Sequence, residues 1–137
     1  EKLQTIGKEF GATTGRPRRC GWFDVPLANY SIMINGFSEI TMTKLDILDE
    51  FNEIKVCTEY QCNGEKSKNL SAFINQLGDI VPIYTSMTGW NCSTVGINSF
   101  NQLPKEAQNY VHYLENILSI SIKHISTGPK RNDMIIR

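Results

Sequence analysis

The strongest structural signal in this chain is an amphipathic segment spanning residues 103–118. Pro104 and Glu106 are typical of a first helical turn. The apolar residues that follow recur at intervals of three and four: Ala107, Tyr110, Val111, Leu114, Ile117 and Leu118. A helix with one apolar face has to bury it, and strand-like segments elsewhere in the chain offer a sheet to pack against. We therefore predict an α/β protein, with a mixed sheet and flanking helices.

The other expected elements fit this class. A shorter helix begins near Asp24, which can cap it, and ends at Asn35-Gly36; its apolar face comprises Leu27, Tyr30, Met33 and Ile34. We predict strands over residues 38–43, 53–61, 80–86, 120–126 and 134–136. Asn63-Gly64 indicates a hairpin turn, and Pro82 indicates an edge strand. Residues 72–77 form a short amphipathic segment, while Trp22, Trp90, Tyr84 and Tyr110 are expected to pack in the core.

Composition excludes several classes of function. The 137 residues, 40% of them hydrophobic, suit one globular domain. Net charge is zero, but residues 1–20 carry five Lys or Arg against two Glu, so the positive charge is local and argues against a broad nucleic-acid surface. No apolar run approaches the roughly 20 residues of a membrane helix. The four cysteines lack CxxC spacing, which argues against zinc and favours reduced thiols in the cytoplasm.

Residues 11–22, GATTGRPRRCGW, predict an anion-binding loop. Small residues let backbone amides approach a ligand, and guanidinium groups bind carboxylate or phosphate bidentately. Alternation along the loop should aim Arg16 and Arg18 together and Arg19 elsewhere. The alternatives are a solvated run of charge and a DNA-binding hook around Gly15-Arg16-Pro17, but such a hook needs an arginine where Thr14 stands.

Two further motifs lie at predicted strand ends. Thr43-Lys44-Leu45-Asp46 resembles the NKxD motif of GTPases, with Thr43 replacing the asparagine. An aspartate there can accept both N1–H and the 2-amino group of guanine, and the lysine stem can cover the ring. Ser126-Thr127-Gly128-Pro129 has the composition of a turn.

Together with LPKEAQNYVHYLE at residues 103–115, these blocks resemble, in order, the C-terminal third of adenylosuccinate synthetase. The resemblance implies the C-terminal part of a P-loop-NTPase-like purine ligase, which joins IMP to L-aspartate at the expense of GTP, needs Mg²⁺ and forms a homodimer. A chain that begins with Glu1 and enters the loop at once is expected to be a piece of a longer protein.

The resemblance also implies the ligand-binding residues. The aspartate and IMP site would comprise Ala12, Thr13, Thr14, Gly15, Arg16, Pro17 and Arg18. The GTP site would comprise Arg18, Lys44, Leu45, Asp46, Ser126, Thr127 and Gly128. The phosphate loop, the catalytic residues and the Mg²⁺ ligands would lie in the absent N-terminal part, so we expect residues 1–137 alone to be inactive. The alternative function is a non-catalytic guanine-nucleotide-binding module.

Overall fold

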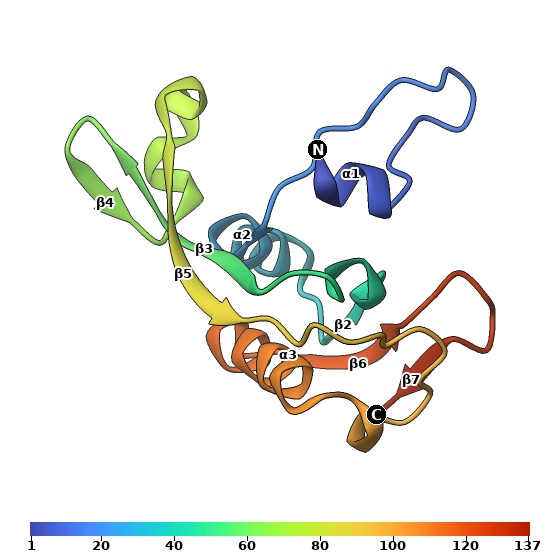
Figure 1. Ribbon diagram of the computed structural model, residues 1–137. Coiled ribbons are helices and arrows are strands. Elements are labelled where there is room, and N and C mark those ends of the chain that lie inside the picture. The colour runs from blue at the N-terminus through green and yellow to red at the C-terminus, as the bar shows by residue number, and fades with distance from the viewer.

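The computed structural model describes residues 1–137 and divides the strands between two small mixed sheets (Figure 1). In the first sheet β3 (Glu53–Cys62) pairs in parallel with β1 (Phe23–Asp24) and antiparallel with β4 (Glu65–Ser67) and β5 (Val81–Thr88). In the second sheet β6 (Ser121–Ser126) lies between the parallel strand β2 (Glu39–Met42) and the antiparallel strand β7 (Met134–Ile136). The predicted α/β class is confirmed.

The helices are mostly short. The α-helices are α1 (Lys2–Ile6), α2 (Val25–Asn35) and α3 (Lys105–Leu118), and the 3-10 helices are η1 (Leu45–Leu48), η2 (Leu70–Asp79) and η3 (Phe100–Gln102). The helix expected over residues 103–118 is therefore confirmed, beginning two residues later because Pro104 occupies its N-cap. The segment expected at residues 72–77 lies within η2, where Phe73 and Gln76 interrupt the helical geometry.

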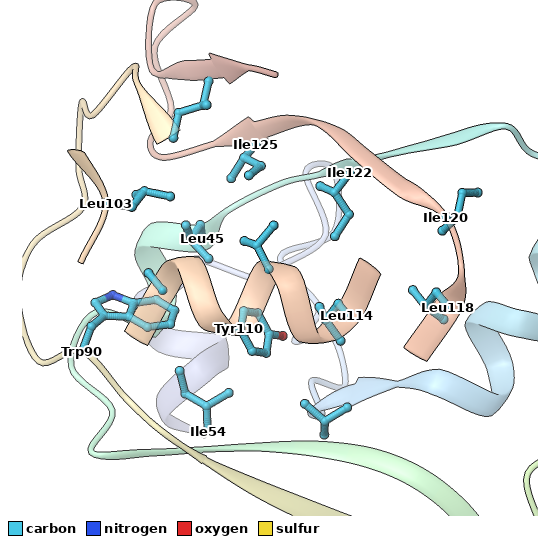
Figure 2. Packing of buried hydrophobic residues seen from close by; sticks show 14 of the residues in the cluster. Leu45, Ile54, Trp90, Leu103, Tyr110, Leu114, Leu118, Ile120, Ile122 and Ile125 are labelled. Atoms are coloured by element: carbon cyan, nitrogen blue, oxygen red, sulfur yellow. The ribbon is translucent and has the colours of Figure 1, made fainter. Parts of the chain in front are cut away.

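The main core forms around α3. Its predicted apolar face is buried at Ala107, Tyr110, Val111, Leu114 and Leu118, with Ile117 partly buried. Figure 2 shows Ile54 of β3 on one side of the helix and Ile122 and Ile125 of β6 on the other. Each fully buried side chain of this size contributes about 1.5–3 kcal/mol. Burial of α3 thus joins the two sheets into one body.

The helix α2 forms as predicted but packs with a different face. Asp24 caps it by accepting the Leu27 N–H at 3.0 Å, and Gly36 ends it in the left-handed region at φ 63°. However, Leu27, Met33 and Ile34 are exposed, whereas Val25 and Pro26 are buried. The prediction that Leu27, Met33 and Ile34 form the buried face of this helix is therefore wrong. This helix is apolar around most of its circumference, so periodicity could not select the buried side.

The strand predictions are confirmed, but one aromatic residue on a strand lies outside the core. Asn63 and Gly64 both have positive φ, 51° and 86°, and form the tight turn between β3 and β4. Strand β5 pairs with β3 only, as the edge position of Pro82 predicts. Alternation along this exposed edge leaves Tyr84 43% exposed, so its predicted core position is wrong.

Candidate nucleotide and anion site

Parallel pairing of β2 and β6 brings two distant motifs to one edge of a sheet. Ile40 lies beside Ile122, and Met42 beside Ile125, so both strands end on the same side. The chain leaves β2 into residues 43–46 and leaves β6 into residues 127–129. In α/β proteins ligands commonly bind outside the carboxyl ends of such strands. The two predicted guanine-site motifs therefore meet in space.

A pocket of about 270 Å³ lies where these motifs meet. It is lined by Ile6, Gly7, Lys8, Lys44, Asp46, Ile47, Gly128 and Pro129. Three of these residues, Lys44, Asp46 and Gly128, belong to the GTP set predicted from the sequence. The lining combines two lysines, a carboxylate and two glycines around an opening large enough for part of a nucleotide.

Asp46 presents an unsatisfied acceptor. Its Oδ1 is buried and has no hydrogen-bond partner in the chain. Burial raises the pKa of the Asp46 carboxyl above its ordinary value, and the nearby charge of Asp49 adds to the effect. A buried acceptor without a partner is unfavourable, so a ligand that donates N–H groups here removes a cost as it binds.

Lys44 is held at the mouth of the same pocket. It has a left-handed backbone at φ 61°, two residues after the end of β2. Its Nζ donates to the Gly7 carbonyl at 2.8 Å and forms an ion pair with Oε1 of Glu9. The ammonium group is therefore anchored on the segment that precedes the predicted anion-binding loop of residues 11–22, called the arginine loop below. The Lys44 side chain remains 45% exposed.

The arginine loop projects into solvent, and backbone hydrogen bonds join its two ends. Phe10 and Pro17 form an antiparallel bridge, the Gly11 N–H donates to Arg16 O at 2.8 Å, and the Arg18 N–H donates to Glu9 O at 2.9 Å. Gly15 has φ 64° at the turn, which favours glycine there. Residues 12–21 are exposed, and Figure 1 shows this segment extending away from the sheets. The backbone of the loop can thus reach a ligand.

The loop side chains differ in their partners. Arg18 Nη1 lies 3.1 Å from Glu9 Oε2, whereas the side chains of Arg16 and Arg19 make no hydrogen bond or ion pair within the chain. The Thr14 hydroxyl accepts the Arg16 N–H at 3.4 Å. Ala12 and Thr13 are exposed. The expected common direction of Arg16 and Arg18 stays a prediction, because only Arg18 has a fixed partner.

The turn after β6 is tightly supported. Thr127 is fully buried; its hydroxyl donates to Ile97 O at 2.7 Å and its N–H donates to Asp133 O at 2.9 Å. The Ser126 hydroxyl donates to Gly128 O at 3.1 Å. The hydroxyl and N–H of Thr127 are already bonded within the chain. We therefore expect Thr127, a member of the predicted GTP set, to support the turn and not to bind the nucleotide directly. Leu45 is 1% exposed and packs in the core, so we expect it too to support the site and not to contact a ligand.

Two residues of this region were missed from the sequence. Asp49 accepts the indole N–H of Trp90 at 2.7 Å and both the N–H and the hydroxyl of Thr94, at 2.7 and 2.8 Å, and so ties η1 to the chain after β5. Glu9 binds both Arg18 and Lys44. The only available signal was their place in the sequence: Asp49 lies three residues after the Thr43–Asp46 motif, and Glu9 lies two residues before the predicted anion-binding loop.

No group of three or more His, Cys, Asp or Glu side chains lies close enough together to hold a metal ion. All four cysteines are free. None of the helices has the length and apolar character required to cross a bilayer.

Comparison with known proteins gives one consistent match. A family model for adenylosuccinate synthetase matches residues 1–135. Over 137 residues the chain is 46% identical to adenylosuccinate synthetase of Solibacter usitatus and 44% identical to that of Coccidioides posadasii, and covers 32% and 33% of their lengths. A fully ligated adenylosuccinate synthetase from Plasmodium falciparum has a similar structure, with a TM-score of 0.89 and 33% identity, over 99% of this chain and 33% of that one. The chain therefore spans about a third of these relatives.

Proposed function

Because this chain belongs to the adenylosuccinate synthetase family, we propose that it forms the C-terminal part of a GTP-dependent ligase. The enzyme joins IMP and L-aspartate to give adenylosuccinate, GDP and phosphate in purine nucleotide biosynthesis. It acts in the cytoplasm as a homodimer. Residues 1–137 supply aspartate capture and guanine selection, and the remainder of the enzyme supplies the phosphoryl-transfer machinery.

The observation that carries guanine selection is the shared pocket of Lys44, Asp46 and Gly128. The Asp46 carboxylate, whose Oδ1 has no partner within the chain, matches the paired N1–H and 2-amino donors of guanine, a pattern that adenine lacks. The Lys44 stem covers the face of the base while its ammonium stays on Gly7 and Glu9. Ser126 and Gly128 present backbone groups from the opposite wall, and Leu45 and Thr127 hold the two walls in place.

The loop from Ala12 to Arg18 captures aspartate beside IMP. Thr13 and Thr14 donate to a carboxylate, Arg16 binds aspartate and the IMP ribose, and Arg18 lies between this site and GTP. Support comes from the exposure of the loop and the freedom of the Arg16 guanidinium. Two cationic side chains also offset the charge that accumulates when three anionic reactants share one site.

In the reaction, the γ-phosphoryl group of GTP is transferred to the 6-oxygen of IMP. The aspartate amine then attacks carbon 6, and the bond to the phosphorylated oxygen breaks, releasing phosphate. The ligands for Mg²⁺ would lie in the remainder of the enzyme, and the metal would supply positive charge to the GTP phosphates. The residues of this chain hold the dicarboxylate and the base in a reactive arrangement, which is itself a large part of catalysis.

The direct test is phosphate release by the full-length enzyme in the presence of IMP, GTP, Mg²⁺ and L-aspartate. We expect release to require all four components, and residues 1–137 alone to release none. A full-length protein that binds GTP but never releases aspartate-dependent phosphate would instead be a non-catalytic guanine-nucleotide-binding module. Turnover by residues 1–137 alone would contradict the proposed division of labour.

A further inference from the structure

Glu9 has a fixed position between the two ligand-binding segments. Its N–H donates to Gln4 O at 2.9 Å and its carbonyl accepts the Arg18 N–H at 2.9 Å, so the backbone is held on both sides. The side chain is 20% exposed, less than either cation it binds. The backbone of Glu9 is thus placed by the fold before any ligand arrives, while its carboxylate is held only by the side chains of Arg18 and Lys44.

The two oxygens of this carboxylate serve different segments. Oε2 lies 3.1 Å from Arg18 Nη1, at the base of the arginine loop, and Oε1 pairs with Lys44 Nζ, beyond the end of β2. Hydrogen bonds from Lys44 and then Arg18 lower the pKa of the Glu9 carboxyl, so it is charged at neutral pH. One anion therefore connects a cation of the aspartate loop with a cation of the guanine pocket.

A stabilising ion pair alone does not account for this arrangement. Arg18 and Lys44 are 59% and 45% exposed, and exposed ion pairs contribute little to folding stability. Glu9 does, however, determine where two flexible side chains stand relative to each other. Positioning of this kind changes ligand binding more than it changes stability.

We propose that Glu9 is a positioning residue that couples aspartate binding at the arginine loop to guanine-nucleotide binding at the Lys44 pocket. The inference rests on the proposed function of the two segments. A nucleotide that immobilises Lys44 also immobilises Glu9, and through it Arg18. The loop then loses less freedom when aspartate binds, so each ligand tightens the other.

The test is calorimetric titration of L-aspartate into the full-length enzyme with IMP present, with and without saturating GDP. GDP should tighten aspartate binding in the wild type by about fivefold or more. In Glu9→Gln the aspartate affinities measured with and without GDP should agree within about twofold. Glu59→Gln is the matched control. It removes the ion pair between Glu59 on β3 and Lys68, and it should keep the full coupling between GDP and aspartate binding.

Glu9→Asp provides a second variant if Glu9→Gln fails to fold. It keeps the charge but shortens the reach by one methylene, so its coupling should fall below that of the wild type. Full coupling in a folded Glu9→Gln or Glu9→Asp enzyme would overturn the inference, as would a wild type in which GDP and aspartate bind independently. In that case both ligands still bind and the proposed function stands. A wild type that binds neither ligand would refute the proposed function, and the inference with it.

Discussion

Asp46 and Gly128 line the same pocket, although one follows β2 and the other follows β6. Their proximity is a consequence of the parallel pairing of those strands, which ends both at one edge of the sheet. Asp46 contributes a buried oxygen without a partner, and Gly128 contributes the backbone of a half-buried turn.

Gly128→Ala should destabilise the fold and weaken GTP binding. A Cβ at this position would lie 2.5 Å from Oδ2 of Asp133, a residue that is 8% exposed and accepts the Lys130 N–H at 3.0 Å. Because Asp133 cannot move freely, we expect a loss of about 1–3 kcal/mol in the free energy of unfolding. Gly78→Ala, where a Cβ meets nothing within 4 Å, should change it by less than about 0.5 kcal/mol. Equal denaturation midpoints for both variants would contradict the account.

Asp49→Asn should destabilise the chain by about 2–3 kcal/mol, because the carboxylate accepts three hydrogen bonds and an amide must turn its own donor towards one of them. Thermal unfolding followed by circular dichroism measures the loss. Asp79→Asn, at an exposed position that makes no ion pair or side-chain hydrogen bond, is the matched control. If Asp49→Asn and Asp79→Asn had the same unfolding temperature, Asp49 would not be the support of η1.

Arg16→Leu should raise the aspartate KM of the full-length enzyme by about 10- to 100-fold, since it removes a charge-assisted contact. Steady-state rates measured over a range of aspartate concentrations test this. Arg19→Leu removes the same charge from a side chain predicted to point elsewhere, and should leave the KM within about twofold. An equal effect of both substitutions would mean that the loop acts through general charge alone.

Glu115 should make the folded chain sensitive to acid. Burial alone would raise the pKa of its carboxyl, but the Ile122 N–H and the Arg137 guanidinium, each at 2.8 Å, more than offset this, so the pKa lies below its ordinary value of 4.5. A lowered folded-state pKa gives stability that is full above about pH 4.5 and is lost as pH falls through the folded-state value.

Urea denaturation at pH 6 and at about pH 3 measures this contribution. The free energy of unfolding should fall less between the two pH values in Glu115→Gln than in the wild type. Glu39→Gln, an exposed carboxylate that makes no ion pair, should follow the wild type. Parallel pH dependence of Glu115→Gln and the wild type would contradict the assignment.

Local patterns in the sequence predicted local structure well. The spacing of Ala107, Val111 and Leu114 identified α3 because a helix with a single apolar face leaves only one way to bury it. Asp24 and Gly36 marked the ends of α2 through capping chemistry that needs no tertiary context. The inward face of α2 could not be read, because its apolar residues surround the helix.

The geometry of the site depended on long-range pairing that no local pattern encodes. The motif order predicted the family, which the comparisons confirm, but not that β2 and β6 are parallel neighbours. Glu9 and Asp49 were missed for the same reason, since their partners Lys44 and Trp90 are distant in sequence. A lone carboxylate carries no signal of its role until the fold brings its donors to it.

Discrimination between GTP and ITP by the full-length enzyme tests guanine selection by Asp46 most directly. ITP differs from GTP only in lacking the 2-amino group, so the comparison isolates one of the two donors that Asp46 should accept. We expect the wild type to bind GTP about tenfold or more tightly than ITP, and Asp46→Asn to bind the two within about twofold. An Asp46→Asn enzyme that keeps the wild-type preference for GTP would contradict the account.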